Sequence, residues 1–146
     1  MAAAKAKDGD SKLERAQRNG SETVYPKQMF YENTYKIKPD RRFDISLVKK
    51  IVKEELVSVL KNEKYEQARC REYCLSLSQS ICDKIKSLGF DRHKIVCMVT
   101  IGERKNQGLR IGSRCLWNTA HDNWADFVYE LPDMFAHGIV FGVNLD

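Results

Sequence analysis

Cysteine and histidine, the side chains that most often do chemistry in proteins, are scattered along this chain. No two cysteines have C-x-x-C spacing, and the three histidines are not placed as paired Cys/His ligands. A structural zinc site requires Cys or His pairs at short spacing, and a reactive thiol requires an exposed, electropositive setting. We therefore predict no metal and no cofactor, and buried or half-buried thiols. The residues concerned are Cys70, Cys74, Cys82, Cys97, Cys115, His93, His121 and His137.

No catalytic motif is present in the sequence. It contains no G-x-S-x-G, no P-loop, no H-E-x-x-H and no glycine-rich phosphate loop after a strand. His93, Cys97 and Asp122 have no evident base or orienting partner. We expect His93 and His121 to be surface residues, and the sequence predicts a protein that is not an enzyme.

The positive charge is concentrated at the N-terminus. The net charge is +5, and residues 1–42 contain ten basic and six acidic residues. The rest of the chain is nearly neutral, so we expect no large basic face on the folded part. A basic tail could contact acidic tubulin, RNA or a motor subunit. No RNP-like aromatic strand is present, and we do not expect nucleic acid as a partner.

Composition also predicts the compartment. Hydrophobic residues make up 42% of the chain, yet no apolar run approaches the roughly 18–20 residues that a membrane span needs. Residues 1–10 lack the apolar core of a signal peptide. We expect a cytosolic protein that does not bind a membrane.

The chain divides into three parts by composition. Residues 1–22 are polar and charged, and we expect a disordered basic tail. Residues 23–43 are rich in aromatic groups and predict an extended arm that packs on its own domain or on a partner; the residues leave both open. The candidate contact residues of the arm are Val24, Tyr25, Met29, Phe30, Tyr31 and Tyr35. Residues 44–146 form the predicted domain.

Two amphipathic helices are expected first. One begins near 44–46, where Asp44 or Ser46 can cap it, and the other covers about 66–88, with Gly89 suited to end it. Apolar residues recur every three or four positions in both. The first stripe is Val48, Ile51, Val52, Leu56, Val59 and Leu60; the second is Cys70, Cys74, Leu77, Ile81, Ile85 and Leu88.

The period then changes to two and predicts four strands, at 95–101, 109–117, 123–131 and 136–145. The order predicts an α+β fold in which two N-terminal helices pack on a four-stranded antiparallel sheet. Gly138 and Gly142 would allow a helix to approach the last strand closely. The opposite sheet face carries more bulky apolar groups than two helices can cover, which points to a dimer.

Strand 109–117 is amphipathic. Leu109, Ile111, Ser113 and Cys115 lie on one face, and Arg110, Gly112, Arg114 and Leu116 lie on the other. Arginines on such a strand can attract acidic partner residues and discourage wrong edge pairing. From the residues alone, an ordinary covered strand is the better interpretation.

Five segments in order resemble the Tctex-type dynein light chains. They are ENTYKIKPDRRF at 32–43, NEKYE at 62–66, LGFDRHKIVCMVTIG at 88–102, IGSRCLW at 111–117 and VFGVNLD at 140–146. The arm and basic extension are similar to the longer branch, which includes axonemal light chains. Two positions differ: Asn118 stands where the family often has Asp, and Asn144-Leu145 replaces its usual aromatic group.

The resemblance implies a non-catalytic light chain of a dynein motor in the cytoplasm and cytoskeleton, in a cilium or flagellum axoneme. It implies a dimer, with itself or a related light chain, in which the second strand crosses to the other chain's sheet. That strand would dock a dynein intermediate chain by edge pairing and reach the heavy chain complex indirectly. GERKNQG at 102–108 is long enough for a hairpin loop or a crossing.

The alternative to the dynein role is a cargo or signalling adaptor of the same fold that acts outside the motor. The docking residues would be Leu109, Arg110, Ile111, Gly112, Ser113, Arg114, Cys115, Leu116 and Trp117.

Overall fold

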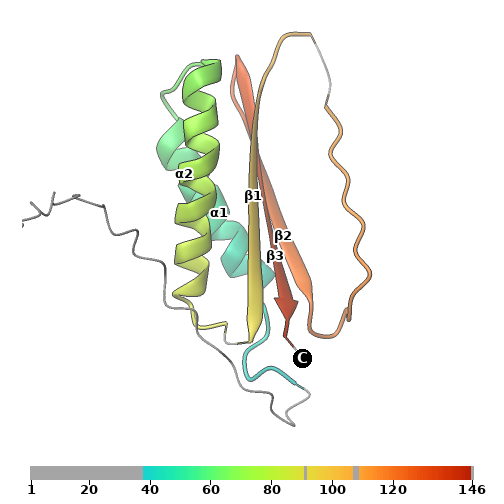
Figure 1. The fold of residues 1–146 in the computed structure, drawn as a ribbon. Helices are drawn as coiled ribbons and strands as arrows, with labels where there is room; N and C mark the ends of the chain where they lie inside the picture. Colours follow the sequence, from blue (N-terminus) through green and yellow to red (C-terminus); the bar gives the residue numbers. More distant parts are fainter. Residues whose placement is uncertain (1–37, 91, 107–108, 146) are drawn as a thin grey trace, which may run out of the picture. The chain divides into compact units, whose positions relative to one another are not determined.

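The computed structural model describes residues 38–90, 92–106 and 109–145, all within the compact unit Tyr31–Asp146. The predicted tail and residues 23–37 of the predicted arm, with Val24, Tyr25, Met29, Phe30, Tyr31 and Tyr35, lie outside the described residues, so the division at 22/23 stays a prediction. The described elements run in the order α1 (Ile45–Leu60), α2 (Gln67–Lys86), β1 (His93–Glu103), β2 (Asn123–Glu130) and β3 (Met134–Asn144) (Figure 1).

Helix α1 begins at the predicted cap. Asp44 Oδ1 accepts hydrogen bonds from the backbone N–H groups of Ser46 (2.9 Å) and Leu47 (3.1 Å), which have no partner within the helix. Every fourth residue then points to the core. These four residues, Val48, Val52, Leu56 and Leu60, are fully buried.

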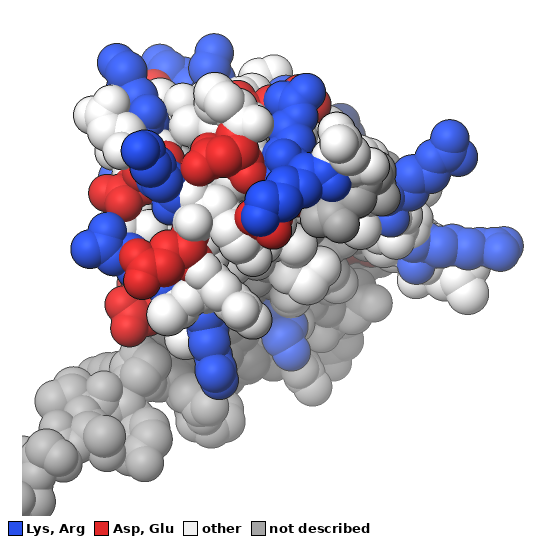
Figure 2. Space-filling view, turned by 90° about the horizontal axis from the view of Figure 1, so that it is seen from above, with Lys and Arg blue, Asp and Glu red and all other residues white. Residues whose placement is uncertain are grey.

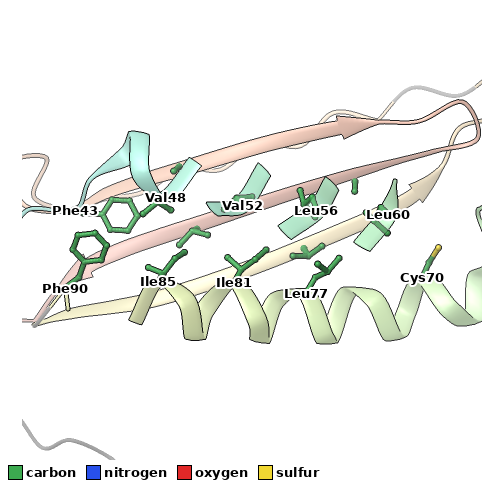
Figure 3. Close-up of a cluster of buried hydrophobic side chains, with 14 of the residues drawn as sticks. Phe43, Val48, Val52, Leu56, Leu60, Cys70, Leu77, Ile81, Ile85 and Phe90 are labelled. Atoms are coloured by element: carbon green, nitrogen blue, oxygen red, sulfur yellow. The ribbon is translucent and has the colours of Figure 1, made fainter. Parts of the chain in front are cut away.

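Helix α2 ends as predicted. Gly89 has a positive φ of 71°, the conformation that glycine adopts at low cost after a helix. Phe90 follows it into the core, where its ring centroid lies 5.5 Å from that of Phe43. The buried side chains of both helices form one layer against the sheet (Figure 3).

The three strands form one antiparallel sheet in the order β1-β3-β2. Strand β3 is central, with pairs such as Val96 with Phe141 on one side and Phe127 with Gly138 on the other. Helix α2 packs on β1, and α1 packs on β2 and β3. The α+β two-layer prediction is confirmed, and β1 and β2 are the sheet edges.

The predicted close approach at the last strand is confirmed. A Cβ atom added at Gly138 would lie 2.8 Å from Val52 Cγ1 and 3.3 Å from Leu56 Cδ1, so only glycine lets α1 lie this near the sheet. At Gly142 the approaching group is the ring of Phe43, which precedes the helix.

The fourth predicted strand is not confirmed. Residues 109–117 contain no strand and run as a loop beside β2 (Figure 1). A short turn after them fixes the chain direction: the N–H groups of His121 and Asp122 donate to the Asn118 carbonyl. The alternating pattern indicated which residues share a face, but a strand forms only where its backbone pairs with a neighbour.

Two smaller expectations are wrong. His93 is buried, with 8% of its surface exposed, because its ring packs against Phe43 and Phe90 and its Nε2 lies 3.3 Å from the His121 carbonyl. Cys115 is exposed, because the segment that carries it does not pack into the sheet. Cys70 is buried and Cys74, Cys82 and Cys97 are half-buried, as expected.

Candidate docking site

Strand β2 presents one edge of the sheet. At its hairpin with β3 the Leu131 N–H donates to the Met134 carbonyl at 2.8 Å. Because hydrogen-bonded pairs alternate in an antiparallel ladder, the odd-numbered residues of β2 bond to β3. The even-numbered residues Trp124, Asp126, Val128 and Glu130 direct their backbone groups to the opposite side.

That side of β2 pairs with no strand of the described chain. The Trp124 N–H is satisfied locally by the Asn123 side chain at 3.0 Å. The backbone N–H and C=O groups of Asp126, Val128 and Glu130 remain for an added strand. An open edge of this kind is a template for pairing with another chain.

The sheet face opposite the helices is apolar and partly exposed. Met98 and Val96 of β1 are 52% and 45% exposed, and Val128 and Trp124 of β2 are 48% and 43% exposed. Large apolar side chains exposed together on one sheet face are typical of a contact surface.

Segment 109–117 flanks the open edge without pairing to it. A cavity of about 320 Å³ lies between the segment's first residues and the strands β2 and β3; it is lined by Arg104, Leu109, Ile111, Asp126, Val128, Glu130, Phe135 and His137. At the other end the Trp117 ring contacts Phe141 edge-on, with centroids 6.2 Å apart. The structure therefore brings the predicted docking residues 109–117 beside β2 and leaves all but the half-buried Trp117 exposed.

Asp122 anchors the return of the segment to the sheet. Its carboxylate accepts hydrogen bonds from the backbone N–H of Asn118 (2.8 Å) and of Asn144 (2.7 Å) at the end of β3. Asp122 is itself buried. From the sequence Asp122 was a candidate only for catalysis; an Asp four residues after an Asn in a turn was the available signal for this capping role.

Each of the two carboxylates of β2 has a basic side chain beside it. Glu130 lies 3.5 Å from Arg104, and Asp126 lies 3.3 Å from Nε2 of the buried His137. The sequence assigned 123–131 to a strand but did not single out Asp126, Glu130 or Arg104, because the open side of that strand depends on the strand order of the folded sheet. Because Asp126 and Glu130 both belong to β2, the open edge carries two carboxylates.

Two of the thiols, Cys74 and Cys97, are not set up as nucleophiles. Burial raises the pKa of Cys97 to about 12, and burial likewise raises the pKa of Cys74, so both remain protonated near neutral pH. Within the ranges that the structure describes, no three His, Cys, Asp or Glu side chains are grouped to hold a metal ion.

The described surface carries mixed charge. In the view of Figure 2, lysine and arginine are interspersed with aspartate and glutamate. Several pairs lie close together, among them Arg69 with Glu63 and Glu66. No helix of the described residues is long and apolar enough to cross a bilayer.

Known proteins match most of the chain. The family model described as "Tctex-1 family" matches residues 42–143. Dynein light chain Tctex-type 5-B of Xenopus laevis is 38% identical over 112 residues, which are 77% of this chain and 64% of that protein. Dynein light chain Tctex-type 5 of Homo sapiens is 35% identical over 115 residues, 79% of this chain and 64% of that protein. Dynein light chain Tctex-type protein 2B of Homo sapiens is 36% identical over 113 residues, 76% of this chain and 80% of that protein. The match thus spans less than two thirds of the Tctex-type 5 relatives.

Proposed function

The chain belongs to the Tctex-1 family, and from this premise we propose that it is a non-catalytic light chain of a dynein motor complex. The family is non-catalytic, and the relatives that match most of the chain carry the name dynein light chain. Protonated thiols at Cys74 and Cys97 and an open edge at β2 fit a docking role better than a catalytic one.

The proposed mode of action is strand exchange followed by edge docking. Segment 109–117 extends away from its own domain and pairs with the open edge of β2 in a second light chain. The segment then forms the new edge, which an extended stretch of a dynein intermediate chain joins by backbone hydrogen bonds. One observation carries this proposal: an unpaired edge and an exposed, unpaired segment lie beside each other in one chain.

The apolar sheet face supports the same proposal. Val96, Met98, Trp124 and Val128 are exposed in the single chain, and a second copy would cover them. The heavy chain complex is reached only through the intermediate chain. The arm residues Val24, Tyr25, Met29, Phe30, Tyr31 and Tyr35 form a second contact, on the domain or on a partner.

The proposed location is the axoneme of a cilium or flagellum, within the cytoplasm and cytoskeleton. Support comes from the arm and basic extension, which are similar to the longer family branch. The alternative, a cargo or signalling adaptor of the same fold, uses the same edge but not the motor. Restriction of the protein to ciliated cells favours the motor role, and broad expression in cells without cilia favours the adaptor.

The test removes two backbone donors from the docking edge. Ile111→Pro with Ser113→Pro deletes two N–H groups, whereas the control Ile111→Val with Ser113→Ala keeps them. Tagged protein is recovered from ciliated cells, and the dynein intermediate chain is detected by immunoblot. We expect the control to retain the intermediate chain and the proline variant to lose it. A folded proline variant that retains it would contradict edge docking.

A further inference from the structure

We propose that segment 109–117 and the open edge of β2 are complementary in one register, so that the partner in the exchange is a second copy of this chain. In that register Arg110 lies opposite Glu130 and Arg114 lies opposite Asp126. The inference rests on the proposed strand exchange and names its partner and its specificity residues.

Spacing is the first argument. Asp126 and Glu130 lie four residues apart on the outer face of β2, and Arg110 and Arg114 lie four residues apart on one face of the segment. Four strand residues span about 13 Å in each case. One antiparallel alignment therefore matches both pairs of opposite charges at once, and cross-strand ion pairs of this kind stabilise a sheet.

The same alignment matches the neighbouring residues. It places Leu116 opposite Trp124 and Gly112 opposite Val128. Leu116 is 97% exposed in the single chain and Trp124 is 43% exposed, so their contact removes apolar surface from water. Gly112 has no side chain to obstruct Val128.

The arginines are available for this contact. Arg110 and Arg114 are exposed, and neither forms a hydrogen bond or ion pair with any residue in the described ranges. Glu130 has 65% of its side chain exposed despite its contact with Arg104. A carboxylate accepts several hydrogen bonds, so a second cation can be added without displacing the first.

Other registers are electrostatically worse. A slip by two residues places Arg114 opposite Trp124 or Val128 and leaves both carboxylates without a cross-strand cation. A slip by one residue turns both arginines to the helix face. There they would approach Lys53, whose Nζ lies 5.9 Å from the Phe127 ring centroid.

The backbone pattern fits as well. In this register the even-numbered residues of the segment bond to the even-numbered residues of β2. The N–H groups of Ile111 and Ser113 then face the new edge, where the intermediate chain is proposed to pair. Exchange and docking use different backbone groups of the same segment.

Pairing with a second copy of the chain forms both the Arg110–Glu130 and the Arg114–Asp126 ion pair twice. In a two-fold exchange each copy gives one segment and receives one, so four ion pairs form from two kinds of contact. A parallel alignment would instead pair Arg110 with Asp126 and Arg114 with Glu130, and it would separate Leu116 from Trp124.

Charge reversal on exposed residues tests the register. Arg110→Glu and Glu130→Lys each place like charges together twice in the homodimer, and we expect the dimer dissociation constant to rise roughly tenfold or more. An equimolar mixture of the two variants restores both pairs, as does the double variant R110E/E130K in one chain. Sedimentation equilibrium at low salt measures the constants, and circular dichroism checks folding.

Arg114→Glu mixed with Glu130→Lys is the matched control. These residues are not opposite in the proposed register, so we expect no recovery. Recovery by this control mixture, or wild-type dimerisation by the single variants, would overturn the register while leaving strand exchange intact. A wild-type chain that stays monomeric but pairs with a different light chain would overturn self-pairing alone. A chain that forms neither kind of dimer would contradict the proposed exchange.

Discussion

At the residue scale, Asp122 matters most for the docking site. Its buried carboxylate bonds the backbone of the turn at Asn118 and the end of β3 at Asn144. The same side chain thus sets where segment 109–117 leaves the sheet and secures the last strand.

We predict that Asp122→Ala lowers the free energy of unfolding by about 2–4 kcal/mol, because two bonds to a charged acceptor are lost and two N–H groups lose their partner. Asp122→Asn keeps one acceptor oxygen and should cost less. Urea unfolding at low protein concentration measures both. An alanine variant within about 0.5 kcal/mol of wild type would show that the anchor is dispensable.

Glu55 is the buried acid between the helices. Burial raises the pKa of Glu55, but the hydrogen bonds from Lys84 and from Ser80 (2.6 Å) outweigh it and leave the pKa below its ordinary value of 4.5. A carboxyl with a lowered folded pKa stabilises the fold above its unfolded pKa and loses that effect as pH falls through the folded value.

We therefore predict that Glu55→Gln is less stable than wild type at pH 7 and that the difference shrinks below about pH 4.5. Thermal unfolding of both proteins between pH 3 and 7 measures it, and the other carboxyls cancel in the comparison. A difference that is constant with pH would mean that Glu55 acts by shape and not by charge.

At the element scale, the packing of α1 on β3 depends on glycine. Gly138→Ala would bring its Cβ to within 2.8 Å of Val52 Cγ1, which forces the helix away from the sheet. We predict a loss of about 1–3 kcal/mol in the free energy of unfolding.

Gly112→Ala is the control for this variant, since a Cβ there would meet nothing within 4 Å. It should change the unfolding free energy of the monomer by less than about 0.5 kcal/mol. Equal losses in the two variants would point to glycine's backbone freedom as the cause, and not to crowding at the helix.

Some elements of the fold could be predicted from the sequence, and others could not. The helices were predictable because their signals are local: Asp44 caps one, Gly89 ends the other, and the apolar residues repeat at helical spacing. The glycine face of β3 was predictable because such residues need a close neighbour.

Segment 109–117 was not predictable in the same way. Its alternating pattern describes a strand, yet its backbone pairs with no neighbouring strand in the described chain. Likewise the acidic edge could not be read from 123–130 alone, since the strand order β1-β3-β2 decides which side of β2 is open. Burial of His93 depends on Phe43, fifty residues away.

At the scale of the whole molecule, pairing of two chains should leave an alternating trace in amide exchange. We predict that in the dimer the amides of Gly112 and Arg114 exchange slowly, because they bond to the partner's β2, while those of Ile111 and Ser113 exchange quickly.

Hydrogen–deuterium exchange by NMR, above and below the dimer dissociation constant, measures this pattern. Addition of an intermediate-chain peptide should then slow Ile111 and Ser113 as well. The inverse pattern, with odd residues slow in the free dimer, would mean that the segment pairs through its other side.

The turn at 118–122, which Asp122 anchors, also affects whether strand exchange stops at a dimer or continues as a polymer. Each molecule offers one donor segment and one acceptor edge, so exchange can close within a pair or continue from copy to copy as a polymer. Donor and acceptor are joined by the few residues of the turn that Asp122 fastens to β3. A short, fixed connection keeps the segment of each molecule close to its own β2 edge. The molecule that accepts a segment therefore holds its own segment close to the donor's open edge. Reciprocal closure is thereby favoured, and loosening the turn would be expected to turn a discrete dimer into open-ended chains.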